Sequence, residues 1–322
     1  MRILICPLNW GLGHASRCIP IIHKLTLQGH EVVIVADGYP LQLLQLEFPQ
    51  LSFLQYPSYS ISYSDGKSQI FAMLKCLPNI MAGVVKEHYW LKKLLVNEYF
   101  DQVISDNRFG LWSKKTHSIY ITHQLMIKMP NGIKWLEPIG WMLHQFIINQ
   151  YNECWVPDNP THGGLSGDLS HKYPLPKHTK FIGTQSRFSL INGLTPNAEY
   201  HTVAILSGIE SQRQHLEQQI IEKNKNEAFR TLIVAGKPSA ASISTQIANV
   251  TIISHVSTLE LANYLLGCNK IICRSGYSTI MDLHTLGCLH KAELIPTPGQ
   301  TEQEYLAEYH LDISKNRKDP MN

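Results

Sequence analysis

The sequence has 322 residues, of which 44% are hydrophobic, and its 28 basic and 25 acidic residues give a formal net charge of +3. This length is enough for two well-packed domains. Because the charges are nearly balanced and form no long run of one sign, nothing electrostatic indicates a nucleic acid partner.

Cysteine usage and hydropathy bear on location. Three of the seven cysteines, Cys6, Cys154 and Cys273, lie inside apolar runs, where a thiol behaves as a small hydrophobic group. The first residues are too short an apolar stretch for a secretion signal, and no run reaches the roughly 18 to 20 apolar residues that span a bilayer. We therefore expect a cytoplasmic protein with reduced thiols.

The first half of the chain contains short apolar runs that predict buried strands. They lie at 2–6, 31–36, 51–55, 102–105, 118–122, 153–156 and 180–183. Continuous apolarity is typical of a parallel sheet that is covered on both faces. We predict a Rossmann-like α/β domain over 1–184.

A segment without clear periodicity, 185–200, contains Gly193 and Pro196 and is predicted to be a linker. A second series of strands follows, at 202–207, 230–236, 250–254, 270–276 and 291–296. It predicts a second parallel α/β domain over 201–322. In open α/β sheets, ligands bind outside the carboxyl ends of the strands, so we expect both sheets to face one cleft.

The first loop, "NWGLGHASR", follows the first predicted strand. Gly11 and Gly13 allow a sharp turn and close approach to a ligand, although they also fit an ordinary tight turn. His14 falls in the first turn of the next helix, whose positive end disfavours protonation of the ring. A neutral His14 could act as a general base. A hydrogen bond from the ring to the loop explains a histidine at this position equally well.

Three further loops follow predicted strands. "ILSGIESQR" contains Gly208, and "IICRSGYSTIMDL" offers backbone N–H groups and hydroxyls at a helix start. Asp282 is expected in the first turn of that helix, where it either stabilises the helix or accepts hydrogen bonds from a diol. "IPTPGQTEQEYLAEY" brings Glu302 and Gln303 to a further helix start. Packing alone does not require four loops of this kind at strand ends, so together they indicate a ligand-binding site.

The C-terminal blocks "CRSGYSTIMDL" and "LIPTPGQTEQEYLA" resemble the donor-binding region of MurG-like (family 28) glycosyltransferases, and "GLGH" is similar to the first loop of that family. The resemblance implies the GT-B architecture, with two Rossmann-like domains, and a UDP-sugar donor. It places four residues along the donor diphosphate: Ser275, Gly276, Ser278 and Thr279.

The same resemblance assigns roles to other positions. It places Asp282 at the ribose hydroxyls, Gln303 at the donor sugar and Gly208 near the nucleotide. Gly11, Gly13 and His14 would lie on the acceptor side, and "THQL" nominates His123 there as well.

The sequence departs from the family at several points. Asn9 and Trp10 precede Gly11, and Ala307 lies near a position that can contact the sugar through a polar group. The residues after Gln303 span only 304–322, where relatives continue through helices that cross back onto the first domain. We therefore leave the sugar and the acceptor open, and expect the crossing helices to be lacking.

The expected chemistry needs no metal and no cofactor, because the sequence shows neither an Asp-x-Asp pair in a suitable position nor zinc-ligand spacing. Helix N-termini, with hydrogen bonds worth about 1.5 to 3 kcal/mol each, would neutralise a leaving diphosphate. Arg274 adds a charge there or forms an ion pair. We expect inverting displacement, with His14 as base and Asp106 as second candidate, although Asp106 fits a loop cap equally well.

The stretch 70–95 mixes Tyr89 and Trp90 with Lys86, Lys92 and Lys93. This composition suits peripheral contact with the inner face of a membrane, as in the similar region of the family, and a glycolipid or cell-surface glycan precursor as acceptor. An amphipathic stripe is more often a core face.

Other function classes remain open. Gly11, Gly13 and Asp37 fit an NAD-dependent oxidoreductase, except that Ser16 stands where the third glycine is expected. A nucleotide-sugar epimerase can share the two-domain fold, and so can a binding protein without turnover.

Overall fold

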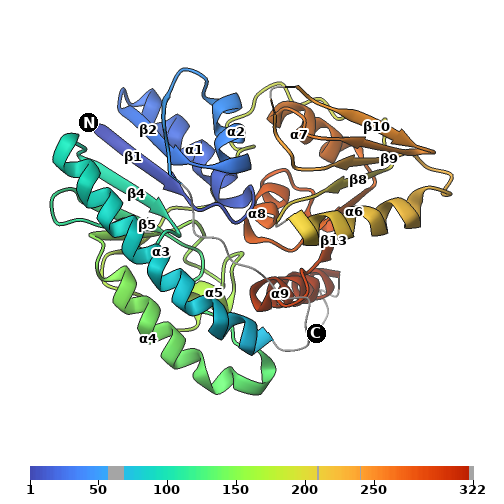
Figure 1. Cartoon of the computed structure of the whole chain (residues 1–322). Coiled ribbons are helices and arrows are strands. Elements are labelled where there is room, and N and C mark those ends of the chain that lie inside the picture. The colour runs from blue at the N-terminus through green and yellow to red at the C-terminus, as the bar shows by residue number, and fades with distance from the viewer. Residues whose placement is uncertain (57–68, 209, 240, 319–322) are drawn as a thin grey trace. The chain divides into compact units, whose positions relative to one another are not determined.

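The computed structural model describes residues 1–56, 69–208, 210–239 and 241–318, and the chain divides into two compact α/β units (Figure 1). Unit 1 consists of Met1–Asn9, Ile21–Leu41 and Phe48–Thr184. Unit 2 consists of Trp10–Pro20, Gln42–Glu47 and Gln185–Asn322. The first loop and the predicted linker therefore both belong to unit 2.

Unit 1 is built on a parallel sheet with the order β3-β2-β1-β4-β5-β6-β7. The strands are β1 (Arg2–Pro7), β2 (Glu31–Ala36), β3 (Ser52–Gln55), β4 (Gln102–Asp106), β5 (His117–Ile121), β6 (Glu153–Val156) and β7 (Thr179–Phe181). Chain order runs outward from β1 to one side and from β4 to the other, so the order reverses between these two strands. At such a switch point, the loops after the two strands diverge and leave room for a ligand.

The helices between these strands include two that contribute residues to both units. They are α1 (Gly13–Leu27), α2 (Gly38–Glu47), α3 (Gln69–Asn97), the 3-10 segment η1 (Asn131–Leu136), α4 (Glu137–Ile148) and α5 (Asp168–His171). No helix among the described residues is long and apolar enough to cross a membrane.

Unit 2 contains a six-stranded sheet with the order β10-β11-β9-β8-β12-β13. Its elements are β8 (Thr202–Ile205), α6 (Glu210–Asn224), β9 (Thr231–Val234), β10 (Ser244–Ile247), β11 (Val250–Ile253), α7 (Thr258–Gly267), β12 (Lys270–Arg274), α8 (Tyr277–Thr285), η2 (Leu289–Lys291), β13 (Ala292–Ile295) and α9 (Thr301–Lys318). The order reverses between β8 and β12, which are parallel neighbours. This is the switch point of unit 2.

The predicted α/β fold class is confirmed for both units, with one correction. Strand β10 was not predicted, and it pairs antiparallel with β11, so the second sheet is not wholly parallel. All four residues of β10 are exposed, which leaves no apolar run for a sequence pattern to reveal. Ala248, with φ of 52°, forms the tight reversal between the two strands.

The stretch predicted as a membrane-surface patch forms α3, and its C-terminal half has a core face. Leu91 is completely buried, and Trp90 packs against Tyr56 with ring centroids 4.5 Å apart. Tyr89 is 67% exposed on another side of the helix. The side chains of 69–77, Lys75 among them, lie outside the described residues.

A buried ion pair fastens α3 to the sheet of unit 1. Arg108 Nε donates to Glu87 Oε1 at 2.8 Å, and both side chains are almost completely buried. Glu87 Oε2 also accepts from the backbone N–H of Gly110 at 3.1 Å. Burial raises the pKa of Glu87, while the Arg108 guanidinium opposes that shift. Each charge therefore depends on the other for compensation.

Substitution Arg108→Met tests this dependence, because it leaves the Glu87 carboxylate buried without its cation. We expect the free energy of unfolding to fall by about 3 to 5 kcal/mol in urea titrations at pH 7. The double variant with Glu87→Met removes both charges, so its loss should be clearly smaller than the sum of the two single losses. Additive losses would show that the two charges do not stabilise each other.

Candidate functional site

Two glycine loops of unit 2 meet backbone to backbone. Gly11, in the first loop, has φ of 100°, and Gly208, in the loop after β8, has φ of 101°. A Cβ atom at Gly11 would lie 3.2 Å from both N and Cα of Gly208. Glycine is therefore required at Gly11 both by its backbone conformation and by the contact. The loops of these two predicted site glycines lie together.

The first loop is also bonded to the start of α8. Ser278 Oγ donates to the carbonyl oxygen of Gly13 at 2.8 Å, and a Cβ at Gly13 would lie 3.1 Å from that hydroxyl. Helix α8 begins at Tyr277, with Gly276 as its N-cap and no side-chain hydrogen bond capping it. The first-turn N–H groups are the ones that a helix cannot satisfy internally. Thr279 lies in the same turn and is half-buried.

The loops after β12 and β13 are joined. Ser275 is completely buried, and its Oγ donates to the carbonyl oxygen of Gln303, in the first turn of α9, at 2.7 Å. The Gln303 side chain accepts from the N–H of Thr297 at 2.9 Å and donates to Gln300 Oε1 at 2.5 Å. Because β12 and β13 are parallel neighbours, both loops lie at one edge of the sheet. Glu302 lies half-buried in the same first turn.

Arg274 ends β12 and is turned into the protein. Its guanidinium donates to the carbonyl oxygens of Pro296 and Gln212, each at 3.0 Å, and 5% of the residue is exposed. Burial lowers its pKa. These bonds connect the end of β12 with the loop after β13 and with helix α6. Arg274 therefore stabilises the loops through buried backbone contacts.

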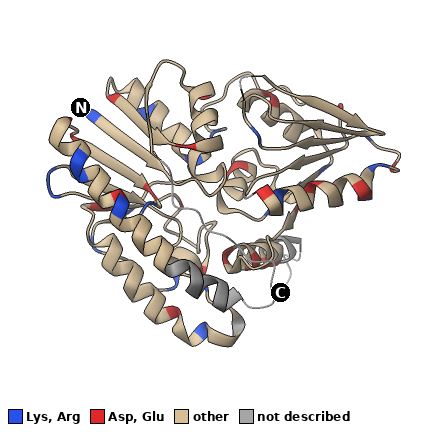
Figure 2. Ribbon diagram, in the orientation of Figure 1, with Lys and Arg blue, Asp and Glu red and all other residues tan. Residues whose placement is uncertain are grey.

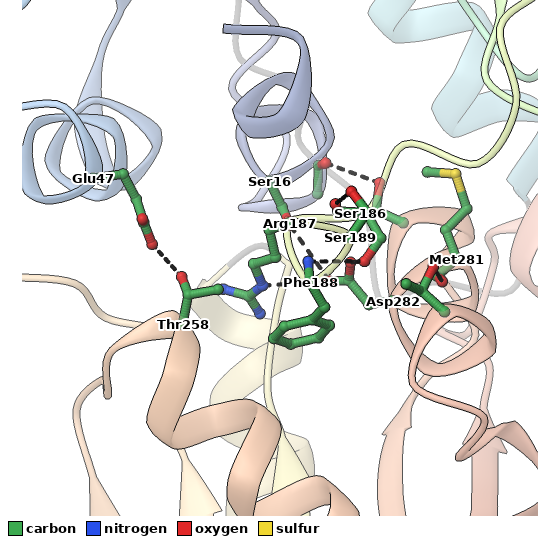
Figure 3. A network of polar contacts seen from close by, with 12 residues as sticks. Ser16, Glu47, Ser186, Arg187, Phe188, Ser189, Thr258, Met281 and Asp282 are labelled. Atoms are coloured by element: carbon green, nitrogen blue, oxygen red, sulfur yellow. Dashed lines mark hydrogen bonds and ion pairs between the residues drawn. The ribbon is translucent and has the colours of Figure 1, made fainter. Parts of the chain in front are cut away.

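Asp282 lies at the centre of a buried polar network (Figure 3). Its Oδ1 accepts from Ser186 Oγ at 2.6 Å, and its Oδ2 accepts from Ser16 Oγ at 3.4 Å. Arg187 Nε lies 3.4 Å from Oδ2 as an ion-pair partner. Burial raises the pKa of Asp282, and Arg187 with the two hydroxyls acts in the opposite direction. One carboxylate thus holds α1, the segment after residue 184, and α8.

The position of Asp282 corrects the sequence prediction in one respect. It lies in the second turn of α8, not the first, and α8 has no acidic residue in its first turn. It therefore does not act as a first-turn charge on the helix terminus, an effect that fades within one turn. Both carboxylate oxygens already have partners from the protein, so contact with a ribose diol would require one of these partners to be exchanged.

Thr258, the first residue of α7, hydrogen-bonds through Oγ1 to the carboxylate of Glu47, the last residue of α2 (Figure 3). This bond links another part of unit 2 to the edge that carries the loops. It involves none of the predicted site residues.

His14 occupies the first turn of α1 and is half-buried. Its Nδ1 lies 2.9 Å from an Nη atom of Arg17, one helical turn further on. Arg17 is only 1% exposed. The predicted helix start is confirmed, and Arg17 is a neighbour that sequence reasoning missed, although residues three apart on a helix lie on one face.

The two remaining candidates lie in unit 1 and are buried. Asp106 is the last residue of β4, not the first of the loop, and none of it is exposed. His123 follows β5 and is 7% exposed. Burial in the unliganded chain does not alone decide the matter, and Asp106 as the second candidate base stays a prediction.

Sequence reasoning missed two further residues of the network, Ser186 and Arg187. Both fall in the segment predicted as a linker, where composition gives no sign of a long-range partner. Among the described residues, no group of three or more His, Cys, Asp or Glu side chains could hold a metal ion. A cavity of about 440 Å³ is lined by 195–198 with Glu260, Asn263 and Tyr264. The cavity is thus lined by the segment before β8 and by α7, and it contains none of the predicted site residues.

No protein-family model matches the sequence, and no curated protein sequence matches it. Solved structures do match over nearly the whole chain. Spinosyn rhamnosyltransferase SpnG is 14% identical with a TM-score of 0.60, covering 97% of this chain and 84% of that one. Arabidopsis thaliana UGT89C1, complexed with UDP-L-rhamnose, is 10% identical with a TM-score of 0.53, covering 99% and 94%.

A putative UDP-N-acetylglucosamine 2-epimerase from Listeria monocytogenes is similar as well, with 11% identity, a TM-score of 0.51 and coverage of 98% and 88%. At these identities the likeness concerns the fold. The chain therefore has the two-domain α/β fold of GT-B glycosyltransferases, as the sequence predicted. The cleft between the sheets stays a prediction.

Substitution Asp282→Asn tests the buried network. We expect it to lower the free energy of unfolding by about 1 to 3 kcal/mol at pH 7, because an amide cannot accept at both positions and leaves Arg187 without its anion. Since burial raises the folded-state pKa of Asp282, the native wild type holds a proton more tightly than the unfolded chain. The wild type should therefore gain stability relative to the variant as pH falls from 7 towards the ordinary value of 3.8.

Urea titrations of both proteins at pH 7 and near pH 4.5 measure this difference. Ser189→Ala is the matched control, because the Ser189 hydroxyl donates to the Ser186 carbonyl and does not touch Asp282. A stability difference that does not change with pH would show that Asp282 has the same pKa in the folded and the unfolded protein.

Proposed function

We propose that this protein is a glycosyltransferase that moves a hexosyl group from a nucleoside diphosphate, with UDP as the first choice, to a hydroxyl acceptor. One observation carries the proposal. The two blocks that resemble a donor-binding region follow neighbouring parallel strands and are joined by the Ser275–Gln303 hydrogen bond. They lie beside the switch point between β8 and β12, where ligands of open α/β sheets bind.

The donor diphosphate is proposed to bind at the N-terminus of α8, with the N-terminus of α9 next to it. Each helix end carries about half a positive charge, and the first-turn N–H groups point outward. Gly276, Ser278, Thr279 and Glu302 would contact the donor, with Gly208 on the other side. Arg274 and Ser275 would act indirectly, by holding these loops.

The proposed reaction is direct displacement with inversion. The acceptor oxygen attacks the anomeric carbon and its O–H proton passes to a basic group of the site or to water. The bond to the diphosphate oxygen breaks, with the electron pair leaving on the nucleoside diphosphate. We propose that no divalent metal is required, because helix N–H groups and hydroxyls stabilise the developing charge. Full activity in excess EDTA is the expected result.

The MurG-like assignment rests on the sequence motifs alone, and the neighbouring structures hold varied ligands. SpnG has been crystallised with thymidine diphosphate and with spinosyn aglycone. We propose a nucleotide sugar as the donor class and, from the sequence resemblance, a glycolipid or other glycan precursor as the acceptor class.

Thermal-shift and transfer assays with UDP-, GDP- and dTDP-sugars test the donor. We expect a rise in melting temperature with one nucleotide, and release of that nucleotide when a sugar acceptor mixture is added. Thr279→Val removes one hydroxyl from the first turn of α8, and should weaken nucleotide binding about tenfold. Thr285→Val, in the last turn of the same helix, is the matched control and should bind normally.

Other outcomes would replace the proposal. A shift with NADH and none with nucleotides would support the oxidoreductase. A change in the sugar without any acceptor would identify an epimerase, and donor binding without transfer or hydrolysis would indicate a binding protein. Equal nucleotide binding by the two threonine variants would remove α8 from the donor site.

We also propose peripheral contact with an anionic membrane surface through α4, a helix outside the stretch 70–95 for which the sequence suggested such contact. Five large apolar side chains are at least 50% exposed and recur on one side of η1 and α4: Trp135, Ile139, Met142, Leu143 and Phe146. Exposed Lys134 lies next to them, and charged residues are sparse along α4 in Figure 2. An apolar stripe bordered by a cation suits lipid acyl chains and anionic headgroups.

Cosedimentation with vesicles of phosphatidylglycerol and phosphatidylcholine tests this contact. We expect the wild type to bind anionic vesicles better than neutral ones, and Leu143→Glu with Phe146→Glu to lose most of the binding. Leu311→Glu, at another exposed apolar residue, is the control. A dimer in light scattering that the α4 variant abolishes, without vesicle binding, would assign the stripe to a second copy instead.

A further inference from the structure

The contact between His14 and Arg17 has a chemical consequence for His14. The two atoms, His14 Nδ1 and Arg17 Nη2, lie 2.9 Å apart, which is hydrogen-bond distance. An arginine side chain carries only donors and keeps its charge in proteins. Therefore Arg17 donates, and the ring nitrogen Nδ1 accepts.

A neutral imidazole carries its single proton on one of its two nitrogens. With Nδ1 serving as the acceptor for Arg17, that proton is on Nε2. The Nε2 atom is then a donor and has no lone pair to offer a substrate proton. The nitrogen that does have a lone pair is the one covered by Arg17.

Full protonation of the ring conflicts with the same geometry. An imidazolium has N–H groups at both positions, so Nδ1–H would point at the Arg17 donor. The guanidinium is nearly fully buried and carries a positive charge next to the ring, and the N-terminus of α1 adds to that positive potential. Each effect disfavours a second positive charge at His14.

A histidine that acts as a general base through Nε2 needs the opposite arrangement. Its Nδ1–H then donates to an acceptor that fixes the ring and stabilises the imidazolium as it forms. Here a cation occupies the place of that acceptor. The local geometry of α1 therefore opposes the base role that the position of His14 in the sequence suggests.

We propose that Arg17 is a positioning residue that holds His14 as the Nε2–H tautomer, so that His14 meets the substrate as a hydrogen-bond donor and not as a general base. This proposal rests on the proposed function only for the identity of the substrate, whose phosphate or sugar oxygen would accept the bond. The tautomer itself is a property of the unliganded chain. The attacking hydroxyl then loses its proton to another group or to water.

The tautomer can be measured without any activity. Histidine-selective 15N labelling of the full chain distinguishes a ring nitrogen that carries a proton from one that does not, and His14→Gln identifies the His14 signals. At pH 7 we expect His14 to show a protonated Nε2 and an unprotonated Nδ1. In Arg17→Met, which removes the donor, we expect a mixture of tautomers. A protonated Nδ1 in the wild type would overturn the proposal, whatever the variant does.

Transfer activity then separates a donor from a base. The amide introduced by His14→Gln places an N–H donor near the position of Nε2, whereas the amide in His14→Asn is too short and His14→Ala has none. We expect His14→Gln to keep kcat within about tenfold of the wild type, and His14→Asn and His14→Ala to lose more. Losing a base would instead lower kcat about 10²- to 10⁴-fold in all three variants alike.

The outcomes distinguish a failure of the proposed function from a failure of the proposed roles of Arg17 and His14. If no nucleotide sugar is used, the proposed function fails, while the wild-type tautomer still decides the role of Arg17. If transfer occurs but all three His14 variants are equally inactive, the proposed function stands and the donor role of His14 is wrong.

Discussion

The arrangement of loops in unit 2 depends on one buried carboxylate. Asp282 accepts hydrogen bonds from Ser16 and Ser186 and pairs with Arg187, so three segments distant in sequence converge on one side chain. A buried charge is tolerated only when it is compensated, and each of these partners compensates part of it. The first turn of α1 is thereby held beside α8.

From that fixed point the other loop contacts follow. With α1 beside α8, the Gly13 carbonyl meets the Ser278 hydroxyl, and Gly11 lies against Gly208. The glycines have no side chains to keep the backbones apart, which is why the approach can be so close. The loops then offer backbone N–H groups and small polar side chains, a surface suited to a phosphorylated ligand.

The strands were predictable because buried parallel strands are continuously apolar, and the predicted strands all appear with ends shifted by a few residues at most. Strand β10 was not predictable in this way, because its exposed residues carry no apolar pattern and its pairing depends on the reversal at Ala248. The exposed apolar stripe of α4 was also missed, although here an apolar pattern is present in the sequence. Its spacing is that of an ordinary core helix, and only the structure shows that the apolar side faces outward.

The candidate site was predictable in position but not in the direction of its side chains. Spacing after strand ends placed Gly208, Ser275 and Gln303 at one edge, because parallel strands end together. It could not show that Ser275 and Arg274 turn inward to backbone carbonyls. Nor could it connect Arg187 with Asp282, which lies far along the chain, or reveal that Arg17 decides which nitrogen of His14 carries the proton.

The hydrogen bond between Ser275 and Gln303 has a consequence for protein engineering. Because the loop after β12 is bonded to the start of α9, and Arg274 also bonds to the loop after β13, the region 270–318 forms one connected structural cassette. Exchanging one of its loops between related proteins would break contacts that the other loop supplies. Recombination points that respect the architecture therefore lie before β12 and after α9, and chimaeras that alter donor preference should exchange the whole cassette.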